Sequence, residues 1–370
     1  MQLKEFQNIL GWHSNKKIIV IESDDWGSDR FDLKSKKYYS EKGVDITLNW
    51  MSRFDTFESK DDMEGLLAIL RGGFTGTFQP RMTLLFNPAN PDFTKIMQGD
   101  FKTYYYQTFK EKLFSQGIDG NALMEFYNCG IHEGLLEIGF HGREHLYVNR
   151  WLRDLRSGNS IACEGFKQGV WGFSNAYLSG YKSDYRASFD LDIRKDLDFQ
   201  SLSIKDGVEI IRREFNLEVK YFLAPNGPFS LSLLSTLEDL EIKYIGISKR
   251  FKDAETKINK FFWLNNRVGN YMKAITRNAI FEPSSPAKLD WVGSCLNDIS
   301  QSFKWKKPAV VSTHRVNYVS GLESSNSIHG LLKLRELLNQ IHKNWPDTVF
   351  LTSSQLGDLM NNKVSTNKFP

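Results

Sequence analysis

Two histidines, His141 and His145, lie four residues apart, directly after the apolar run 135–140. Side chains at positions i and i+4 share one face if the backbone between them is helical, so these two imidazoles could bind one metal ion. Two His ligands leave room for a carboxylate and a water molecule, which is the ligand set of a hydrolytic metal site. The spacing therefore predicts a metal centre and leaves its third ligand open.

The same residues also fit a second motif. His141, Glu144 and His145 satisfy the H-x-x-E-H pattern of inverted zinc peptidases, in which the Glu is the catalytic base on a helix. Gly139 and Gly142 flank His141, and each glycine costs a helix interior roughly 1 kcal/mol relative to alanine. A peptidase also leaves the polar residues that follow other apolar runs without a role, so we regard it as the weaker alternative.

Apolar runs and amphipathic segments alternate along the chain, which is typical of an α/β fold with a parallel sheet. The expected strands are 17–22, 82–86, 135–140, 219–223, 243–247, 273–281 and 309–313, with a weaker eighth run at 348–352. Helical patterns cover 203–215, 230–240, 327–342 and 353–360. We therefore expect a distorted parallel (β/α)7-type barrel with long insertions after the first three strands. One domain would span residues 1–360, followed by a polar tail, 361–370.

Side chains that could bind a metal or transfer a proton follow four of these apolar runs. In parallel barrels the active site forms at the carboxyl ends of the strands, so residues at those ends should converge. Each has an ordinary structural explanation when taken alone, because Asp and Asn serve turns and a single His often packs at the edge of a core. The convergent set is Asp24 and Asp25 after the first run, His141 and His145 after the third, Asn226 after the fourth and His314 after the seventh.

Five segments also carry a family resemblance. They are Ser23–Gly27 (SDDWG), Glu137–His145 (EIGFHGREH), Phe222–Gly227 (FLAPNG), Ser312–His314 (STH) and Val349–Ser353 (VFLTS). Together they resemble the polysaccharide deacetylase superfamily, the NodB-homology domain of carbohydrate esterase family 4. The resemblance extends from Ile18 to about Met360, and the first, second and STH motifs are specific in combination.

The resemblance implies a role for each residue. Asp25, His141 and His145 would hold a divalent metal ion, with zinc as the first expectation. Asp24 would be the general base that takes a proton from the attacking water, and His314 the general acid that protonates the leaving amine. These assignments agree with the chemistry of the side chains, since carboxylates accept protons and imidazole titrates near neutrality.

The chain departs from the family pattern at its third motif. The family carries an Arg and an aromatic residue where this chain has Leu223 and Asn226. That Arg orients the base aspartate, so we expect Arg277 to replace it, with Glu282 just beyond. Trp26 stands where the family commonly has a glycine. We therefore expect four residues to support the substrate or the oxyanion: Trp26, Asn226, Arg277 and Glu282. A backbone N–H near Asn226 would contact the oxyanion.

The composition limits the partners. Lys and Arg number 48 against 44 Asp and Glu, a net charge of +4, which is too mild to predict nucleic-acid binding. Three widely spaced cysteines predict a reducing compartment. We see no apolar leader and no membrane span, so we expect a cytoplasmic protein. The mildly amphipathic segment 3–12 should be a helix on its own domain or, less favoured, a contact with the inner membrane surface.

These observations predict a hydrolase that removes an N-acetyl or other acyl group from an amino sugar. An enzyme inside the cell would meet that sugar in a nucleotide- or lipid-linked glycan precursor. Two alternatives remain open on the same fold. One is hydrolysis of another non-peptide C–N amide, such as a ureide or formamide, and the other is a glycan-binding relative without catalysis.

Overall fold

The computed structural model describes residues 8–30, 37–39, 41, 49–74, 78–172, 184–285, 289–321 and 323–361. The polar tail lies outside the described residues except for Asn361, which ends the last helix. The expected helix at 3–12 lies mostly outside them too, and its described part at 9–11 forms bends. Among the described helices, none is both long and apolar enough to cross a membrane.

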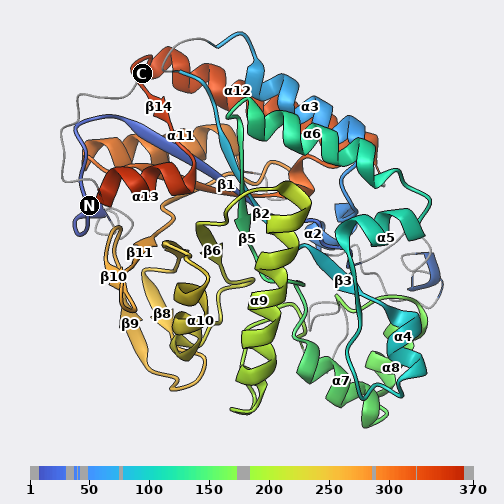
Figure 1. The fold of residues 1–370 in the computed structure, drawn as a ribbon. Helices are drawn as coiled ribbons and strands as arrows, with labels where there is room; N and C mark the ends of the chain where they lie inside the picture. The colour runs from blue at the N-terminus through green and yellow to red at the C-terminus, as the bar shows by residue number, and fades with distance from the viewer. Residues whose placement is uncertain are drawn as a thin grey trace.

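A ten-stranded sheet forms the centre of the molecule, in the order β10-β11-β7-β6-β5-β2-β1-β13-β12, with β14 beside β1 (Figure 1). Its pairings are parallel except that between β10 and β11. The strands are β1 (Ile18–Trp26), β2 (Met82–Phe86), β5 (Leu136–Phe140), β6 (Tyr221–Leu223), β7 (Tyr244–Gly246), β10 (Arg267–Val268), β11 (Met272–Ile275), β12 (Ala279–Ile280), β13 (Ala309–His314) and β14 (Val349–Phe350).

The sheet curls back on itself through one stretch of chain. Strand β11 pairs with β7 at one end of the sheet, and β12 pairs with β13 at the other. Only residues 276–278 separate β11 from β12, so the expected strand 273–281 is split in two between the sheet ends. Counting that stretch once, the main path of the described sheet has seven strand positions joined by parallel pairings, with β14 as a further parallel strand beside β1. The prediction of a distorted (β/α)7-type barrel is confirmed.

The long insertions after the first three barrel strands are also confirmed. The first, between β1 and β2, contains α2 (Trp50–Phe54) and α3 (Lys60–Arg71). The second contains β3 (Ala89–Pro91), α4 (Phe93–Gln98), β4 (Tyr106–Thr108), α5 (Phe109–Ser115) and α6 (Gly120–His132). The third contains α7 (Val148–Arg156), α8 (Ser160–Lys167) and α9 (Asp196–Phe215). Helices α4, α7 and α8 share a small core of their own around Trp151.

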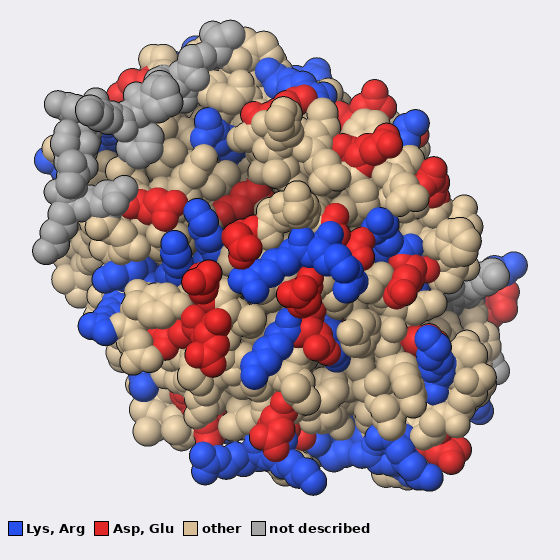
Figure 2. All heavy atoms as spheres, in the orientation of Figure 1, with Lys and Arg blue, Asp and Glu red and all other residues tan. Residues whose placement is uncertain are grey.

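The later connections are shorter. They are η3 (Leu231–Leu233) with α10 (Leu234–Asp239), the hairpin β8 (Arg250–Lys252) and β9 (Asn259–Phe261), α11 (Trp291–Lys304), η4 (Arg315–Asn317) with α12 (Ser324–Asn344), and α13 (Ser353–Asn361). In Figure 1, α3, α6 and α12 cover one side of the barrel and α9 runs along another. On the face that Figure 2 shows, basic and acidic side chains are interspersed.

Alternation along β1 explains how a buried strand can deliver polar groups to a site. Ile19 and Ile21 pack in the large core with the surrounding helices, whereas Ile18 and Val20 pack in a separate inner cluster. Successive strand residues face opposite sides of a sheet, so Glu22 and then Asp24 continue the inner row. The inside of the barrel is therefore apolar at the start of β1 and charged at its end.

Candidate metal and catalytic site

Asp24 and Asp25 are neighbours in sequence, yet both line one pocket. A regular strand would point them to opposite faces. The register between β1 and β2 shifts between Ser23 and Trp26, and Asp25 has a positive φ of 76°. This bulge breaks the alternation, which is how bulges commonly re-aim side chains beside active sites. The pair therefore lies within β1, which ends four residues beyond the end that the apolar run predicted.

His141 and His145 reach the same place through a loop. The backbone between them is not helical, since residues 143–146 form bends and α7 begins only at Val148. Gly142 makes the turn with a φ of +85°. The peptidase alternative required a helix here, and Glu144 is instead buried in an ion pair with Arg143. Glu144 does not line the pocket, so it is not placed to act as a base there.

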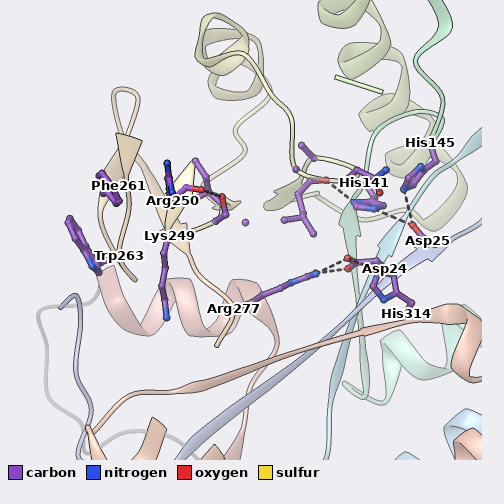
Figure 3. Close-up of a pocket in the computed structure, with 17 residues that line it drawn as sticks. Asp24, Asp25, His141, His145, Lys249, Arg250, Phe261, Trp263, Arg277 and His314 are labelled. Carbon is purple, nitrogen blue, oxygen red and sulfur yellow. Dashed lines mark hydrogen bonds and ion pairs between the residues drawn. The ribbon is translucent and has the colours of Figure 1, made fainter. Parts of the chain in front are cut away.

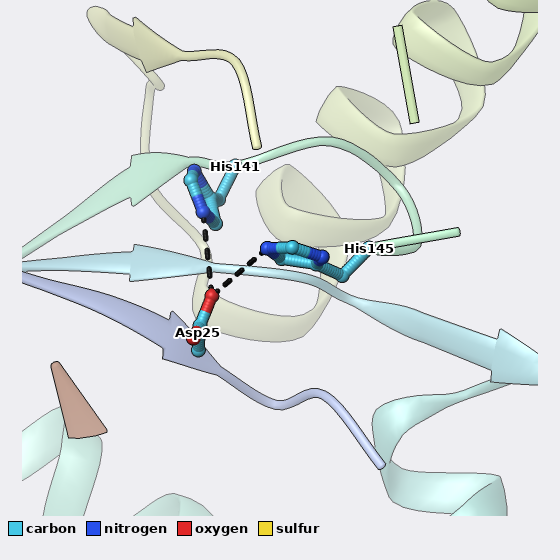
Figure 4. A group of neighbouring side chains, drawn as sticks. All are labelled: Asp25, His141 and His145. Carbon is cyan, nitrogen blue, oxygen red and sulfur yellow. Dashed lines mark ion pairs between the residues drawn. The ribbon is translucent and has the colours of Figure 1, made fainter. Parts of the chain in front are cut away.

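Asp25, His141 and His145 bring one ligand atom each to within 4.8 Å of one another (Figure 4). The Asp25 Oδ1 atom lies 3.0 Å from His145 Nε2 and 3.5 Å from His141 Nε2. Tetrahedral ligands at zinc distances are separated by about 3.3 Å, because each bond is about 2.0–2.1 Å long. All three side chains are buried, with at most 6% of any of them exposed. Their donor set and spacing thus fit a divalent metal ion.

The neighbours of these ligands also suit metal binding. His141 Nδ1 lies 2.8 Å from the Leu223 carbonyl oxygen, to which it can donate a proton, leaving the Nε2 lone pair for a metal. Burial alone would raise the pKa of the Asp25 carboxyl, but Arg30 and the two histidines hold it well below its usual range. Burial also lowers the pKa of His145, which keeps that imidazole neutral. An ionised Asp25 and a neutral His145 are the protonation states that a metal requires.

Arg277 makes a two-pronged contact with Asp24. Its Nη1 donates to Asp24 Oδ2 at 2.7 Å and its Nη2 to Oδ1 at 2.5 Å, while Nε donates to Glu22 at 2.7 Å. Burial would raise the pKa of Asp24, but the guanidinium outweighs it and lowers that pKa. The expected substitute for the family's arginine thus contacts the expected base. Its place between β11 and β12 puts it where the sheet is interrupted.

His314, the last residue of β13, has a carboxylate partner on one side and the pocket on the other. Its Nδ1 lies 2.6 Å from Glu282 Oε1, and its Nε2 lies 3.9 Å from Asp24 Oδ2. Burial disfavours the imidazolium, but Glu282 outweighs this and raises the pKa of His314 to about 9. The imidazole is therefore protonated at neutral pH, with Nε2 turned toward Asp24. Glu282 thus contacts His314 and does not line the pocket, whereas the sequence analysis expected it to support the substrate or the oxyanion.

A cavity of about 730 Å³ opens over these residues (Figure 3). Ligand sites for drug-sized molecules occupy about 300–1,000 Å³, so the volume is sufficient for a sugar with a substituent. Asn226 lines the cavity from the turn after β6, with a positive φ of 55°. Trp26 does not line it. That indole is fully buried, donates to Ser23 Oγ at 2.9 Å and packs edge-on against Tyr127, so it is a core residue.

The first insertion supplies partners of Asp25 that the sequence analysis missed. Arg30 donates to Asp25 Oδ2 at 2.6 Å and to Asp55 at 2.7 Å. Asp55 also pairs with the fully buried Arg315, which in turn donates to Glu58 at 2.8 Å. No local pattern marks these residues, because apart from the contact between Arg30 and Asp25 their contacts join positions 25 to 260 apart in the chain. A buried ionic chain therefore connects Asp25 to the residue that follows His314.

No protein-family model and no curated protein matches the sequence. Several solved structures are similar to it in fold. A candidate polysaccharide deacetylase from Mycobacterium smegmatis is 11% identical over 97% of this chain and 98% of its own, with a TM-score of 0.49. A CE4 family pseudoenzyme from Bacillus anthracis is 11% identical over 94% and 67%, with a TM-score of 0.39. A family 4 acetyl xylan esterase from Clostridium thermocellum, in complex with cobalt, is 10% identical over 93% and 91%, with a TM-score of 0.42. Structures of the family that the motifs resemble are thus among those similar to this chain.

Proposed function

We propose that residues 1–360 form a metal-dependent hydrolase that removes an N-acyl group, acetyl first among them, from an amino sugar. The observation that carries this proposal is the convergence of Asp25, His141 and His145 in one pocket with Asp24 and His314. The first three residues would hold a divalent cation, with zinc the first expectation for this N/O ligand set, which would act as a Lewis acid on the acyl carbonyl and lower the pKa of water.

The remaining residues have distinct roles. Asp24, kept ionised by Arg277, accepts the proton of the attacking water. Each carboxylate oxygen keeps a free lone pair beside its contact with Arg277. His314, protonated at neutral pH because of Glu282, donates a proton from Nε2 to the leaving amine nitrogen. Before the reaction begins, the base Asp24 is therefore ionised and the acid His314 is protonated, as amide hydrolysis requires.

The contact between Arg277 and Asp24 also bears on the two alternatives. A non-catalytic relative was considered because Leu223 replaces the family's arginine. Arg277 supplies a guanidinium to the same carboxylate, and this favours an active enzyme. Hydrolysis of another C–N amide uses the same groups, so the substrate distinguishes it from deacylation of a sugar.

Acetate release from a panel of N-acetylated amino sugars and their glycans tests the proposal. We expect release by the metal-loaded protein and a loss of at least 10³-fold in Asp24→Asn, which keeps the size of the side chain and removes its basicity. Metal analysis of the wild type beside His141→Ala tests the ligand set. No release across the panel, with stoichiometric metal bound, would exclude sugar deacylation and leave hydrolysis of another C–N amide or a non-catalytic glycan-binding relative. An absence of stoichiometric metal under replete conditions would exclude the metal-dependent mechanism.

A further inference from the structure

The cavity extends well beyond the catalytic residues. Its other end is lined by Lys249, Arg250, Phe261 and Trp263, which come from β8, β9 and the segments beside them. Figure 3 shows these four side chains on the opposite side of the cavity from Asp25 and the histidines, with Arg277 between the two groups. We call them the outer end. A substrate long enough to fill the cavity would contact both ends at once.

The β8–β9 hairpin determines which of its side chains face the cavity. Arg250 pairs with Phe261 in the antiparallel ladder, and directly paired residues lie on the same face of a sheet. The next pair, Phe251 with Lys260, lies on the opposite face, and neither residue lines the cavity. Phe261 is 59% exposed, a large apolar ring open at the cavity wall. The hairpin thus presents a cation and an aromatic ring side by side.

The outer end carries positive charge without a counter-charge. Among the described residues, neither Arg250 nor Lys249 forms a side-chain ion pair or hydrogen bond, and the Lys249 Nζ atom is buried. Burial lowers the pKa of Lys249 to about 8, as expected for an ammonium that lacks a partner. The acidic residues that line the cavity, Asp24 and Asp25, lie at its catalytic end.

The nearby acidic side chains already have partners elsewhere. Asp253 accepts hydrogen bonds from the backbone N–H groups of Leu231, Glu255 and Thr256. Glu255 accepts a hydrogen bond from Ser230 Oγ at 3.1 Å. A buried or half-buried cation without a partner is costly, and an anion brought by a ligand would remove that cost.

Resting on the proposed function, we propose that the outer end binds a phosphate or diphosphate group attached to the amino sugar. Arg250 would contact the phosphate oxygens, because its guanidinium matches them in a two-pronged geometry. Lys249 would add to the positive potential beneath it, and Phe261 and Trp263 would pack against an adjoining ring. Arg250 is exposed and can reach a ligand in the cavity, whereas a neutral polysaccharide would leave the half-buried Lys249 without a partner. The substrate class is therefore a phosphate-linked amino sugar.

Calorimetric titration of the full-length, metal-loaded protein tests this inference without relying on turnover. The probes are N-acetylglucosamine and N-acetylglucosamine 1-phosphate. We expect the phosphate form to bind at least tenfold more tightly to the wild type. Arg250→Gln should bind the two probes with about equal affinity. The tighter binding of the phosphate form should persist in Lys260→Gln, the matched control on the other face of the hairpin. Equal binding of the two probes to the wild type, or an advantage that survives in Arg250→Gln, overturns the inference.

Two further probes identify the source of the phosphate. UDP-N-acetylglucosamine represents a nucleotide diphosphate, and N-acetylglucosamine linked through diphosphate to a short polyprenyl chain represents a lipid. The probe of these two that binds more tightly identifies the source of the phosphate group. Failure of the proposed function has a different signature, since it abolishes acetate release from every probe while the binding advantage of the phosphate forms remains.

Discussion

The guanidinium of Arg277 contacts both carboxylate oxygens of Asp24, although the two residues lie 253 positions apart in the chain. Arg277 also holds Glu22, the preceding residue of the inner row of β1, and Ser312 on β13. The Arg277 side chain therefore links Glu22 and Asp24 of β1 to the segment between β11 and β12, where the sheet curls back on itself. Because it sits between two carboxylates, its position is fixed by charge as well as by packing.

Replacing Arg277 with lysine should lower kcat/KM for acetate release about 10²-fold. The charge remains, but an ammonium cannot form the two-pronged contact, and misplacing a catalytic group by about 1 Å costs that much. Arg267→Lys, at the exposed position of β10, is the matched control and should retain wild-type kinetics. Wild-type kcat/KM in Arg277→Lys would contradict a role in orienting Asp24.

Arg30 should act on metal affinity through Asp25. Arg30→Gln removes the charge that contacts Asp25 Oδ2, and loss of such outer partners costs roughly 10- to 100-fold in affinity. Titration with cobalt, followed by its visible absorbance in the folded protein, measures the change. Arg53→Gln, whose partner Glu323 is exposed, should bind cobalt as the wild type does. Equal affinity of Arg30→Gln and the wild type would show that Arg30 serves only the fold.

Glu282 should set the charge state of His314. A carboxylate 2.6 Å from Nδ1 favours the imidazolium, so Glu282→Gln should lower the His314 pKa from about 9 toward its ordinary value. The alkaline limb of the activity profile should then move to lower pH. The stability that this pair contributes is present in full below the pKa of His314 in the unfolded chain and is lost as pH rises through about 9.

NMR titration of 13C-histidine-labelled, metal-free protein measures that pKa directly. The His314 resonance is assigned by its absence from His314→Ala, and exposed His329 on α12 serves as an internal reference that should not change. An unchanged His314 pKa in Glu282→Gln would mean that another group keeps this imidazole protonated.

The sequence was sufficient to predict the barrel and the residues at the strand ends, because both depend on local patterns. The run at 17–22 identified β1, and the motif at 137–145 identified its two histidines. The bulge at Asp25 was not predictable, since it arises from the register between β1 and β2. Arg30 and Arg250 were missed because no motif in the sequence marks them, and their environments depend on tertiary contacts. Arg277 was found only because the family resemblance called for an arginine.

Gly142 offers a test of how the loop between the two histidines positions them. Its φ of +85° disfavours any residue with a Cβ, and a Cβ there would lie 3.2 Å from the Glu144 carbonyl oxygen and from Ser188 Oγ. Gly142→Ala should lower the free energy of unfolding by about 1–2 kcal/mol, the usual cost of a left-handed backbone, and should also weaken cobalt binding because His141 and His145 shift. Gly158 has a similar φ of +71° with open space around it. Gly158→Ala should therefore show comparable destabilisation in chemical denaturation and wild-type cobalt affinity. If both variants bind cobalt as tightly as the wild type, the backbone at Gly142 does not control the spacing of the two histidines.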